Sequence, residues 1–587
     1  MKIGSGSITE RGGIVLRTVV TLASCTAVVV AGAALGVPGR GVVREAEVRT
    51  VQVWLKPDVA GAERFALAVS TPGSPQFHRY LSPDEYTARF GPTAAAAKAV
   101  ADRLTASGLT DVQVSGGRDF VSATGPVSRL QSVGGPDVLA VTGLNSGSRA
   151  LAAAASAKAP VCSQYWAEHV QSFKPAYKGL TKAPLPICGY TAKQLRTAYG
   201  VSPAFSGKGQ TVALTELGFG TAMQKTMQEW AKRSGLPALR PGQYREQTVG
   251  RACTAPSTRS ASRYDDEAEM DSQAVYAMAP HANQLVVVGN GCDEVEGLLN
   301  AVHGVLIGNG HKPSASIVSN SWGLPGDPAS TKTLHALTLR AAAEGVGLYF
   351  SSGDSASLDA VAEEPFATAV GGTTLGLGKR NERVFETGWS SNDVSLDDGK
   401  WNDLGAGSAA GGGTSLVYAQ PAYQKGVVPA SMSHVRVHGK TVVNRVTPDI
   451  SAVADSNTGM LVGHTDDNGR YQTQSTAGTS LSAPLIAGLV AGAQQGRRAP
   501  FGFINPVLYR LHGTPAIRDV LPLTAKTPQQ NRVAYLPATP GYSPSLEFFN
   551  YQGTGTDLVT AKGYDTMTGM GTPNGLFFTL ALRLSPR

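Results

Sequence analysis

The pattern of apolar and polar positions changes character along the chain, and its first part predicts a small mixed domain. Between residues 45 and 140, short alternating runs are typical of strands, and longer runs of helical periodicity lie between them. Strands mixed with helices over so short a span indicate a compact α+β domain. The expected strands are Val51–Leu55, Val112–Val114 and Phe120–Ala123, and the expected helices are 60–69 and 94–107.

From Gln210 onward, short apolar runs alternate with helical stretches, which indicates a parallel sheet covered by helices on both faces. In such sheets, ligands bind beyond the carboxyl ends of the strands. Glu216, Trp322 and Asp354 each follow a predicted strand and are candidates for that edge. The expected strands are Val212–Thr215, Gln284–Val288, Ala315–Ser319 and Gly347–Phe350, and the expected helices are 222–233, 262–279, 294–307 and 331–344.

One predicted helix carries acids on its apolar face. Glu267 and Asp271 share helical spacing with Ala274, Val275 and Met278, so both carboxylates point toward the expected core. Like charges four residues apart repel, and a purely structural helix would avoid burying them. Taken alone, the pattern also fits a rotated helix whose acids are solvated, since acids near a helix N-terminus are common.

A second helix opens on a serine. Ala477–Pro484 is a turn of small residues, and the nearly all-apolar Leu485–Ala493 follows it. Pro484 suits the first turn of a helix, and a helix apolar all round should be buried. Ser480 would then lie at a helix N-terminus, where N–H groups and the helix dipole favour developing negative charge. A buried packing helix explains this stretch equally well, and an Asp in a Gly/Ser turn such as Asp354 is most often a turn former.

Composition narrows the class of protein. The chain has 587 residues, 69 glycines and 35 prolines, and only 16% of its residues are charged, which indicates many tight loops in a folded chain. The net charge is +8, but the basic residues are scattered and form no stripe with aromatic residues. We therefore expect no nucleic-acid partner.

The N-terminus predicts export. Lys2, Arg11 and Arg17 precede an apolar run from Thr18 to Val37 that ends in small residues, so residues 1–37 are interpreted as a signal peptide. A single uncleaved anchor is the alternative, because the run approaches spanning length. We expect a secreted, extracellular protein with no membrane attachment in its mature form.

The cysteines agree with export. Beyond Cys25 there are four, and an even number in an exported chain favours two disulfides. Sequence order suggests Cys162–Cys188 and Cys253–Cys292, although three pairings are possible. Residues 141–186 are interpreted as a linker with a processing site, because 150–160 is rich in Ala, Ser and Lys. Residues 187–587 then form the main domain.

Together these stretches resemble one family. Glu267-Ala-Glu-Met-Asp271, Ser-Gly-Asp354 and Gly-Thr-Ser480-Leu-Ser-Ala-Pro are similar to motifs of the sedolisins, the serine-carboxyl peptidases. Ser74–Tyr86 resembles the signature of their pro-kumamolisin-like activation propeptide. The resemblance implies a subtilisin-like parallel sheet flanked by helices. It also implies a ferredoxin-like propeptide at 45–140, which would act as the enzyme's own chaperone and inhibitor.

The resemblance also implies roles. Ser480 would attack the peptide carbonyl, Glu267 would accept its proton, Asp271 would tune Glu267, and Asp354 would donate to the oxyanion. A carboxylate base has a pKa near ~4, and Asp354 can donate only while protonated, so we expect an acid optimum on protein or peptide substrates. Glu216 and Trp322 resemble positions that extend the acid network in some members. A monomer is expected.

The C-terminal stretch 563–575 resembles the calcium loop of that family. Asp519 and Asp565 would supply carboxylates, and the backbone carbonyls of Val520, Ala561 and Gly563 would complete an all-oxygen shell, which suits Ca²⁺. Ala561 stands where many members have glycine, and the segment from Asp519 to Ala561 is long. A Gly/Asp turn without metal is the alternative reading.

Three other functions are compatible with parts of the sequence. A tripeptidyl-peptidase of the same family would have the same catalytic residues. A subtilisin-type enzyme would need a histidine base, for which His303 is the best-placed candidate, although packing or surface roles suit His281 and His303 better. A non-catalytic exported binding protein would retain the fold, but the joint presence of all four catalytic residue types argues against it.

Overall fold

The computed structural model describes residues 48–144, 161–251, 261–550 and 558–584, apart from residues 219, 221 and 467. The predicted signal peptide, Cys253 and the predicted processing stretch 150–160 lie outside the described residues. Within the described ranges, no helix is long and apolar enough to cross a membrane.

The first domain is the expected α+β unit. Its four strands form an antiparallel sheet in the order β2-β3-β1-β4, which is the strand order of a ferredoxin-like fold. Val51 and Val53 of the central strand β1 pack against Val100 and Leu104 of α3. The elements are β1 (Val48–Leu55), α1 (Val59–Ser70), α2 (Pro83–Arg89), α3 (Ala94–Ala106), β2 (Thr110–Val114), β3 (Phe120–Pro126), α4 (Val127–Leu130) and β4 (Val138–Thr142).

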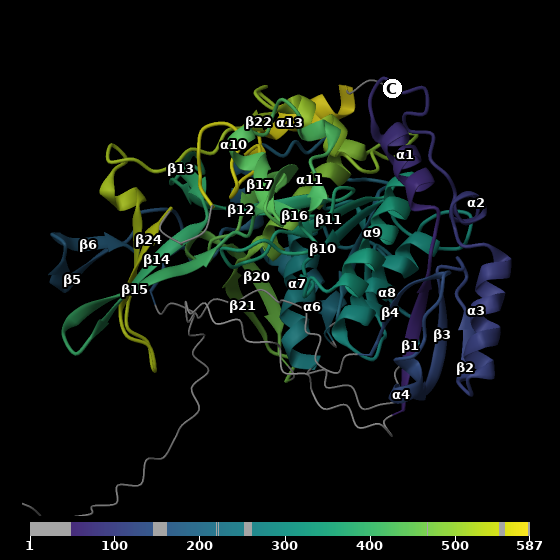
Figure 1. Cartoon of the computed structure of the whole chain (residues 1–587). Helices are drawn as coiled ribbons and strands as arrows, with labels where there is room; N and C mark the ends of the chain where they lie inside the picture. Colours follow the sequence, from purple (N-terminus) through teal and green to yellow (C-terminus); the bar gives the residue numbers. More distant parts are fainter. Residues whose placement is uncertain are drawn as a thin grey trace, which may run out of the picture. The chain divides into compact units, whose positions relative to one another are not determined.

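The second domain is built on an eight-stranded sheet in the order β13-β12-β11-β10-β7-β9-β8, with β19 beside β12 (Figure 1). All pairs are parallel except β12 with β13. This confirms the predicted subtilisin-like α/β fold. The strands are β7 (Thr211–Glu216), β8 (Tyr244–Val249), β9 (Asn283–Gly289), β10 (Ile317–Asn320), β11 (Gly347–Ser351), β12 (Thr368–Leu377), β13 (Arg383–Gly388) and β19 (Ile450–Val453).

Helices cover both faces because alternate strand residues point to opposite sides. Val212 and Leu214 join a core with α7 (Ala261–Met278) and α11 (Thr479–Gln494). Ala213, between them, joins a separate core with α8 (Glu294–Ile307) and α9 (Pro328–Ala343). A further helix, α6 (Met223–Arg233), packs with the α7 side.

Helix α11 is buried along its whole length, as its composition predicts. It lies against α7, and the close approach depends on Gly488. A Cβ at that position would lie 2.7 Å from Met278 Cβ and 3.1 Å from the Val275 carbonyl oxygen. The absence of a side chain at Gly488 therefore lets α11 and α7 pack backbone to backbone.

A smaller sheet was not predicted. It has the order β15-β14-β24-β23 and packs beside the hairpin β5–β6 through an aromatic and aliphatic core that includes Phe173, Tyr535 and Leu546 (Figure 1). We call these six strands the accessory sheet. They are β5 (Val170–Tyr177), β6 (Leu180–Pro184), β14 (Ser390–Asp397), β15 (Lys400–Ala409), β23 (Val533–Leu536) and β24 (Ser545–Phe549).

The accessory sheet corrects part of the linker prediction. Residues 161–186 are not an exposed connection in their second half, because β5 and β6 lie there and bury Phe173 and Leu180. The remaining elements are α5 (Ala192–Ala198), β16 (Gly413–Ala419), η1 (Ala422–Gln424), α10 (Ala430–Ser433), β17 (His434–Val437), β18 (Lys440–Thr447), η2 (Ser456–Thr458), β20 (Met460–Thr465), β21 (Tyr471–Thr476), α12 (Asn505–Leu508), η3 (Tyr509–Leu511), β22 (Ile517–Arg518), η4 (Gln529–Asn531), β25 (Thr572–Pro573) and α13 (Gly575–Leu584).

The packing at Gly488 gives a stability prediction. Gly488→Val should lower the free energy of unfolding by about 1–3 kcal/mol, because the added methyl groups overlap α7. The urea midpoint of the full chain measures this. Gly134→Ala is the matched control, since a Cβ there meets no atom within 4 Å, and it should change stability by less than about 0.5 kcal/mol. Equal midpoints for both variants would contradict the packing account.

Candidate active site

Two of the predicted site residues, Ser480 and Asp354, come together at the carboxyl edge of the large sheet. Ser480 is the second residue of α11, after a turn in which Gly478 adopts φ +102°. Asp354 follows β11, and Ser480 and Asp354 line the same cleft of about 690 Å³. The expected convergence of two separate motifs is therefore present in the fold.

Asp354 is hydrogen-bonded to Thr479, the residue before Ser480. Its Oδ1 accepts hydrogen bonds from the Thr479 backbone N–H at 2.7 Å and from Thr479 Oγ1 at 2.8 Å. Burial raises the pKa of Asp354, and the two bonds from Thr479 only partly offset that effect. Oδ2 has no hydrogen bond to any described residue, so a protonated Asp354 has an O–H to offer in the cleft. The sequence pattern assigned no role to Thr479, although it lies inside the serine motif.

The acids of α7 point inward, as their spacing predicted. Asp271 is fully buried and Glu267 is half-buried. Asp271 shares a side-chain hydrogen bond with the buried Glu216, the last residue of β7. Burial raises the pKa of Glu216 well above its usual range, and the charges of Asp271 and Glu267 add to the effect. Burial also raises the pKa of Asp271, with the charge of Glu267 as the second cause.

Trp322 has a different place from the one expected. Its Nε1–H donates to Thr215 Oγ1 at 2.9 Å, and Thr215 Oγ1 donates to Asn320 Oδ1 at 2.6 Å. These bonds join the ends of β7 and β10 beneath the acid network. Among the described residues, Trp322 has no hydrogen bond to a carboxylate, whereas Glu216 joins Asp271 directly.

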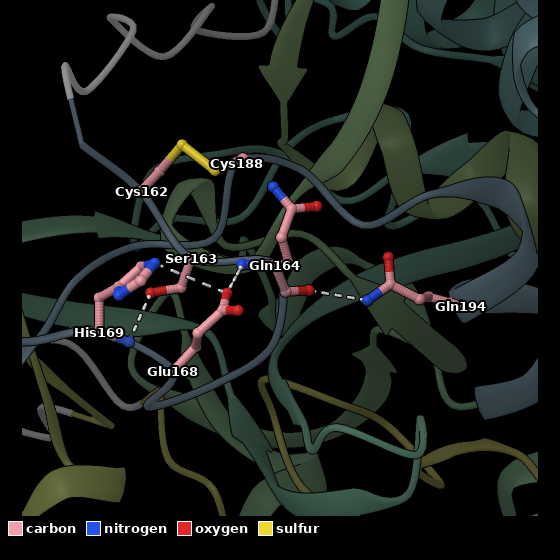
Figure 2. The surroundings of a disulfide bond; sticks show 7 residues. All are labelled: Cys162, Ser163, Gln164, Glu168, His169, Cys188 and Gln194. Carbon is pink, nitrogen blue, oxygen red and sulfur yellow. Dashed lines mark hydrogen bonds and ion pairs between the residues drawn. A yellow bond between two sulfur atoms is a disulfide. The ribbon is translucent and has the colours of Figure 1, made fainter.

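The wall of the cleft comes from distant segments. The predicted disulfide Cys162–Cys188 is present, and both cysteines line the cleft together with Leu536 and Glu547 of the accessory sheet. Figure 2 shows how the loop after Cys162 is held, with the Gln164 N–H donating to Glu168 at 2.6 Å and the Gln194 amide donating to the Gln164 carbonyl. The other expected pair, Cys253–Cys292, includes a residue outside the described ranges.

No histidine is among the described residues that line the cleft. His303, the base that a subtilisin-type mechanism would need, lies under the first domain instead. Its Nε2 is 2.9 Å from Asp119 Oδ2, and its ring packs against Trp54 and Phe120. His464 lies 2.5 Å from Glu269, in a cluster with Asp266, and forms an ion pair there.

Two charged clusters join the first domain to the second. Asp119 contacts Arg340 at 2.7 Å, and Arg340 also contacts the buried Glu344. Burial alone would raise the pKa of Asp119, but Arg340 and His303 lower it overall. In the second cluster, His335 lies between Glu63 of the first domain and Glu364 of the second domain.

His335 is charged over the acid and neutral range. Burial alone would lower its pKa, but the carboxylates of Glu364 and Glu63 outweigh burial and raise it to about 9. Its Nδ1 is 2.8 Å from Glu364 Oε1, and its Nε2 is 3.3 Å from Glu63 Oε1. The stabilisation that protonated His335 gives to the contact between the two domains is therefore fully present below the ordinary histidine pKa. It is lost only as pH rises through about 9.

The predicted calcium residues also lie together. Both carboxylate oxygens of Asp519 accept from the Gly563 N–H at 3.1 Å. Asp565 is fully buried and accepts from the backbone N–H groups of Ala561, Met567 and Thr568. Burial raises the pKa of Asp565 to about 7, and no cationic side chain among the described residues bonds to it.

Comparisons with known proteins agree with this geometry. The family profile described as the pro-kumamolisin activation domain matches residues 40–135, and the subtilase profile matches residues 270–555. Kumamolisin from Bacillus sp. (strain MN-32) is 32% identical over 369 residues, which are 60% of each chain. Sedolisin from Pseudomonas sp. (strain 101) is 26% identical over 496 residues, 78% of each chain.

A solved structure supports the fold. Pseudomonas sedolisin, a serine-carboxyl proteinase complexed with two molecules of pseudo-iodotyrostatin, superimposes with a TM-score of 0.50 at 23% identity, covering 68% of this chain and 99% of that one. The sequence match with kumamolisin spans three fifths of the length of that protein.

The fold and the profiles together define a subtilisin-like α/β domain that is preceded by an activation domain. Within that class, the chain is similar to members of the sedolisin family, among them kumamolisin and sedolisin.

Proposed function

We propose that this protein is a secreted serine-carboxyl endopeptidase that acts in acid and is made as a self-processing zymogen. The observation that carries the proposal is the shared cleft of Ser480 and Asp354, backed by the buried carboxylates of Asp271 and Glu216. The disulfide Cys162–Cys188 suits an oxidising compartment, in agreement with export.

In the proposed reaction, Ser480 Oγ attacks the carbonyl carbon of the scissile bond while its proton passes to Glu267. The carbonyl oxygen becomes an oxyanion, which accepts a hydrogen bond from protonated Asp354 Oδ2. The intermediate then expels the amine, which takes the proton from Glu267, and an acyl-enzyme remains. Water attacks it by the same steps, with Glu267 again accepting the proton and returning it to Ser480.

The pH dependence follows from the two protonation states that this scheme needs. Glu267 must be ionised to accept a proton, and Asp354 must be protonated to donate one. Because burial raises the pKa of Asp354, its donor form persists above the ordinary aspartate range and is lost as pH rises through that raised pKa. Activity should therefore peak in acid and decline toward neutrality.

Replacing the base tests the mechanism. Glu267→Gln should lower kcat/KM for a peptide substrate at acid pH by about 10³-fold or more, because the nucleophile loses its proton acceptor. Glu269→Gln is the matched control, since it makes the same change on the same helix at a residue paired with His464. A Glu267→Gln enzyme with full turnover, or a wild type most active in alkaline buffer, would refute the proposal.

The first domain is proposed to be the propeptide, acting as chaperone and inhibitor, with cleavage in or near 150–160. Acid release follows from the sign of the Asp119 shift. A carboxyl whose pKa is lowered stabilises docking at pH values above the ordinary aspartate range, and that contribution is lost as pH falls through the lowered pKa. His335 stays charged in acid, and we therefore assign the release step to Asp119.

Asp119→Asn should raise the midpoint pH of self-processing by about one unit, the size expected for one charge-assisted hydrogen bond. Gel analysis of the full chain across a pH series measures the midpoint. Asp137→Asn, at an exposed position of the same domain, should leave it unchanged. A midpoint that Asp119→Asn does not move would exclude this contact from the release step.

A calcium ion is proposed at the C-terminal loop. The buried Asp565 has a raised pKa and no cationic partner among the described residues, so a cation would supply the charge that the site lacks. Asp519 and Asp565, with the carbonyls of Val520, Ala561 and Gly563, form an oxygen-only donor set that suits Ca²⁺. When bound, the ion would cross-link the loop; it has no role in the chemical steps.

Chelation should lower the thermal midpoint of the protein, by the equivalent of about 2.7 kcal/mol relative to free Ca²⁺ at 100 times its Kd. Differential scanning calorimetry with EDTA and with added Ca²⁺ measures the shift. Asp519→Asn should abolish the calcium dependence, whereas Asp398→Asn in an exposed turn should preserve it. A calcium-independent midpoint in the wild type would leave the loop as a Gly/Asp turn.

A further inference from the structure

The nucleophile has an unusual backbone carbonyl. In an α-helix, the carbonyl of residue i accepts from the N–H of residue i+4, and the residue four positions after Ser480 is Pro484, which has no N–H. The Ser480 carbonyl therefore cannot form its helical hydrogen bond. A buried carbonyl needs another donor, and Ser480 is only 4% exposed.

Ser321 supplies that donor. It follows the last residue of β10, it is buried, and its Oγ lies 3.1 Å from the Ser480 carbonyl oxygen. The same Oγ lies 2.5 Å from Asp271 Oδ2. Ser321 therefore stands between the backbone of the nucleophile and the carboxyl that neighbours the general base.

A hydroxyl carries only one proton, so Ser321 cannot donate to both acceptors at once. An ionised carboxylate accepts hydrogen bonds about twice as strong as those to a neutral acceptor. When Asp271 is charged, the Ser321 hydroxyl therefore donates its hydrogen bond to the Asp271 carboxylate. A protonated Asp271 loses that advantage, and the amide carbonyl of Ser480 becomes the competing acceptor.

The charges around Asp271 decide which state holds. Glu267 lies one turn earlier on α7, and Glu216 faces it from β7. Burial and the charge of Glu267 raise the pKa of Asp271, while the bonds from Ser321 and Glu216 oppose the rise. Ser321 thus stabilises the ionised form, and any competing acceptor for its proton favours the neutral form.

Resting on the function proposed above, we propose that Ser321 is a positioning residue that couples the protonation of Asp271 to the backbone of the nucleophile. When Asp271 is protonated, the Ser321 proton holds the Ser480 carbonyl and fixes the first turn of α11. When Asp271 ionises, the Ser321 hydroxyl donates its hydrogen bond to the Asp271 carboxylate instead, and the first turn of α11 loses that hydrogen bond.

Two readouts separate coupling from a merely structural role. The first is the pH at which Asp271 loses its proton, followed by pH-difference infrared spectroscopy with the Asp271→Asn spectrum subtracted. The second is kcat on the acid plateau. Ser321→Ala should raise the Asp271 midpoint by about one pH unit and lower kcat about fivefold with little change in KM, and Ser321→Thr should restore both.

Pro484→Ala sharpens the test because it gives the Ser480 carbonyl a helical N–H. In the Ser321→Ala background it should restore kcat but leave the Asp271 midpoint raised. Alone, it should lower the midpoint, since the Ser321 proton is then released to the carboxylate. Ser319→Ala is the matched control, because its buried Oγ has no hydrogen-bond partner among the described residues.

The result that overturns the inference is an Asp271 midpoint that neither Ser321→Ala nor Pro484→Ala moves. A loss of kcat in Ser321→Ala that Pro484→Ala does not restore would also overturn it. If Ser321→Ala fails to fold, the Asp271 midpoint of the Pro484→Ala single variant decides between coupling and no coupling. Failure of the proposed function would appear instead as a wild type without acid proteolysis, and the infrared midpoints would still be measurable.

Discussion

The close packing of α7 on α11 is the constraint on which the site depends. Glu267 and Asp271 are on one helix and Ser480 is on the other, and Gly488 lets the two backbones approach within contact of Met278 and Val275. Fully buried helices hold side chains more rigidly than loops do. Asp271 is fully buried there, and it lies beside the carboxylates of Glu267 and Glu216 and the hydroxyl of Ser321.

The electrostatics of the cleft region differ from those of the contact between the two domains. Inside the site, burial raises the pKa values of Asp271, Glu216 and Asp354, so neutral acids persist there. At the contact with the first domain, Arg340 does the opposite and holds Asp119 ionised. Under the proposed function, a fall in pH would therefore act in opposite ways on the two regions, because it would favour a protonated Asp354 in the cleft and weaken the ionic contact between the two domains.

Much of this could be predicted from the sequence, since the strands of the large sheet and the helices between them follow strong periodic patterns. The inward direction of Asp271 followed from its spacing with Val275 and Met278. Ser321 and Thr479, which contribute through hydrogen bonds of small polar side chains, could not be predicted, because a single serine or threonine carries no periodic pattern. The accessory sheet was missed because its strands come from three separate parts of the chain, although Asp398-Gly399 between β14 and β15 is a typical hairpin turn.

The disulfide Cys162–Cys188 has a consequence for the proposed processing of the chain. Cys162 lies close to the stretch in which the chain is proposed to be cut, so the new amino terminus would begin beside the cleft that the same segment lines. Maturation would then leave behind a tethered end rather than a loose one. Trimming of that end by other proteases would stop at the cross-link, so the entrance of the cleft would keep its shape even in an environment rich in aminopeptidases.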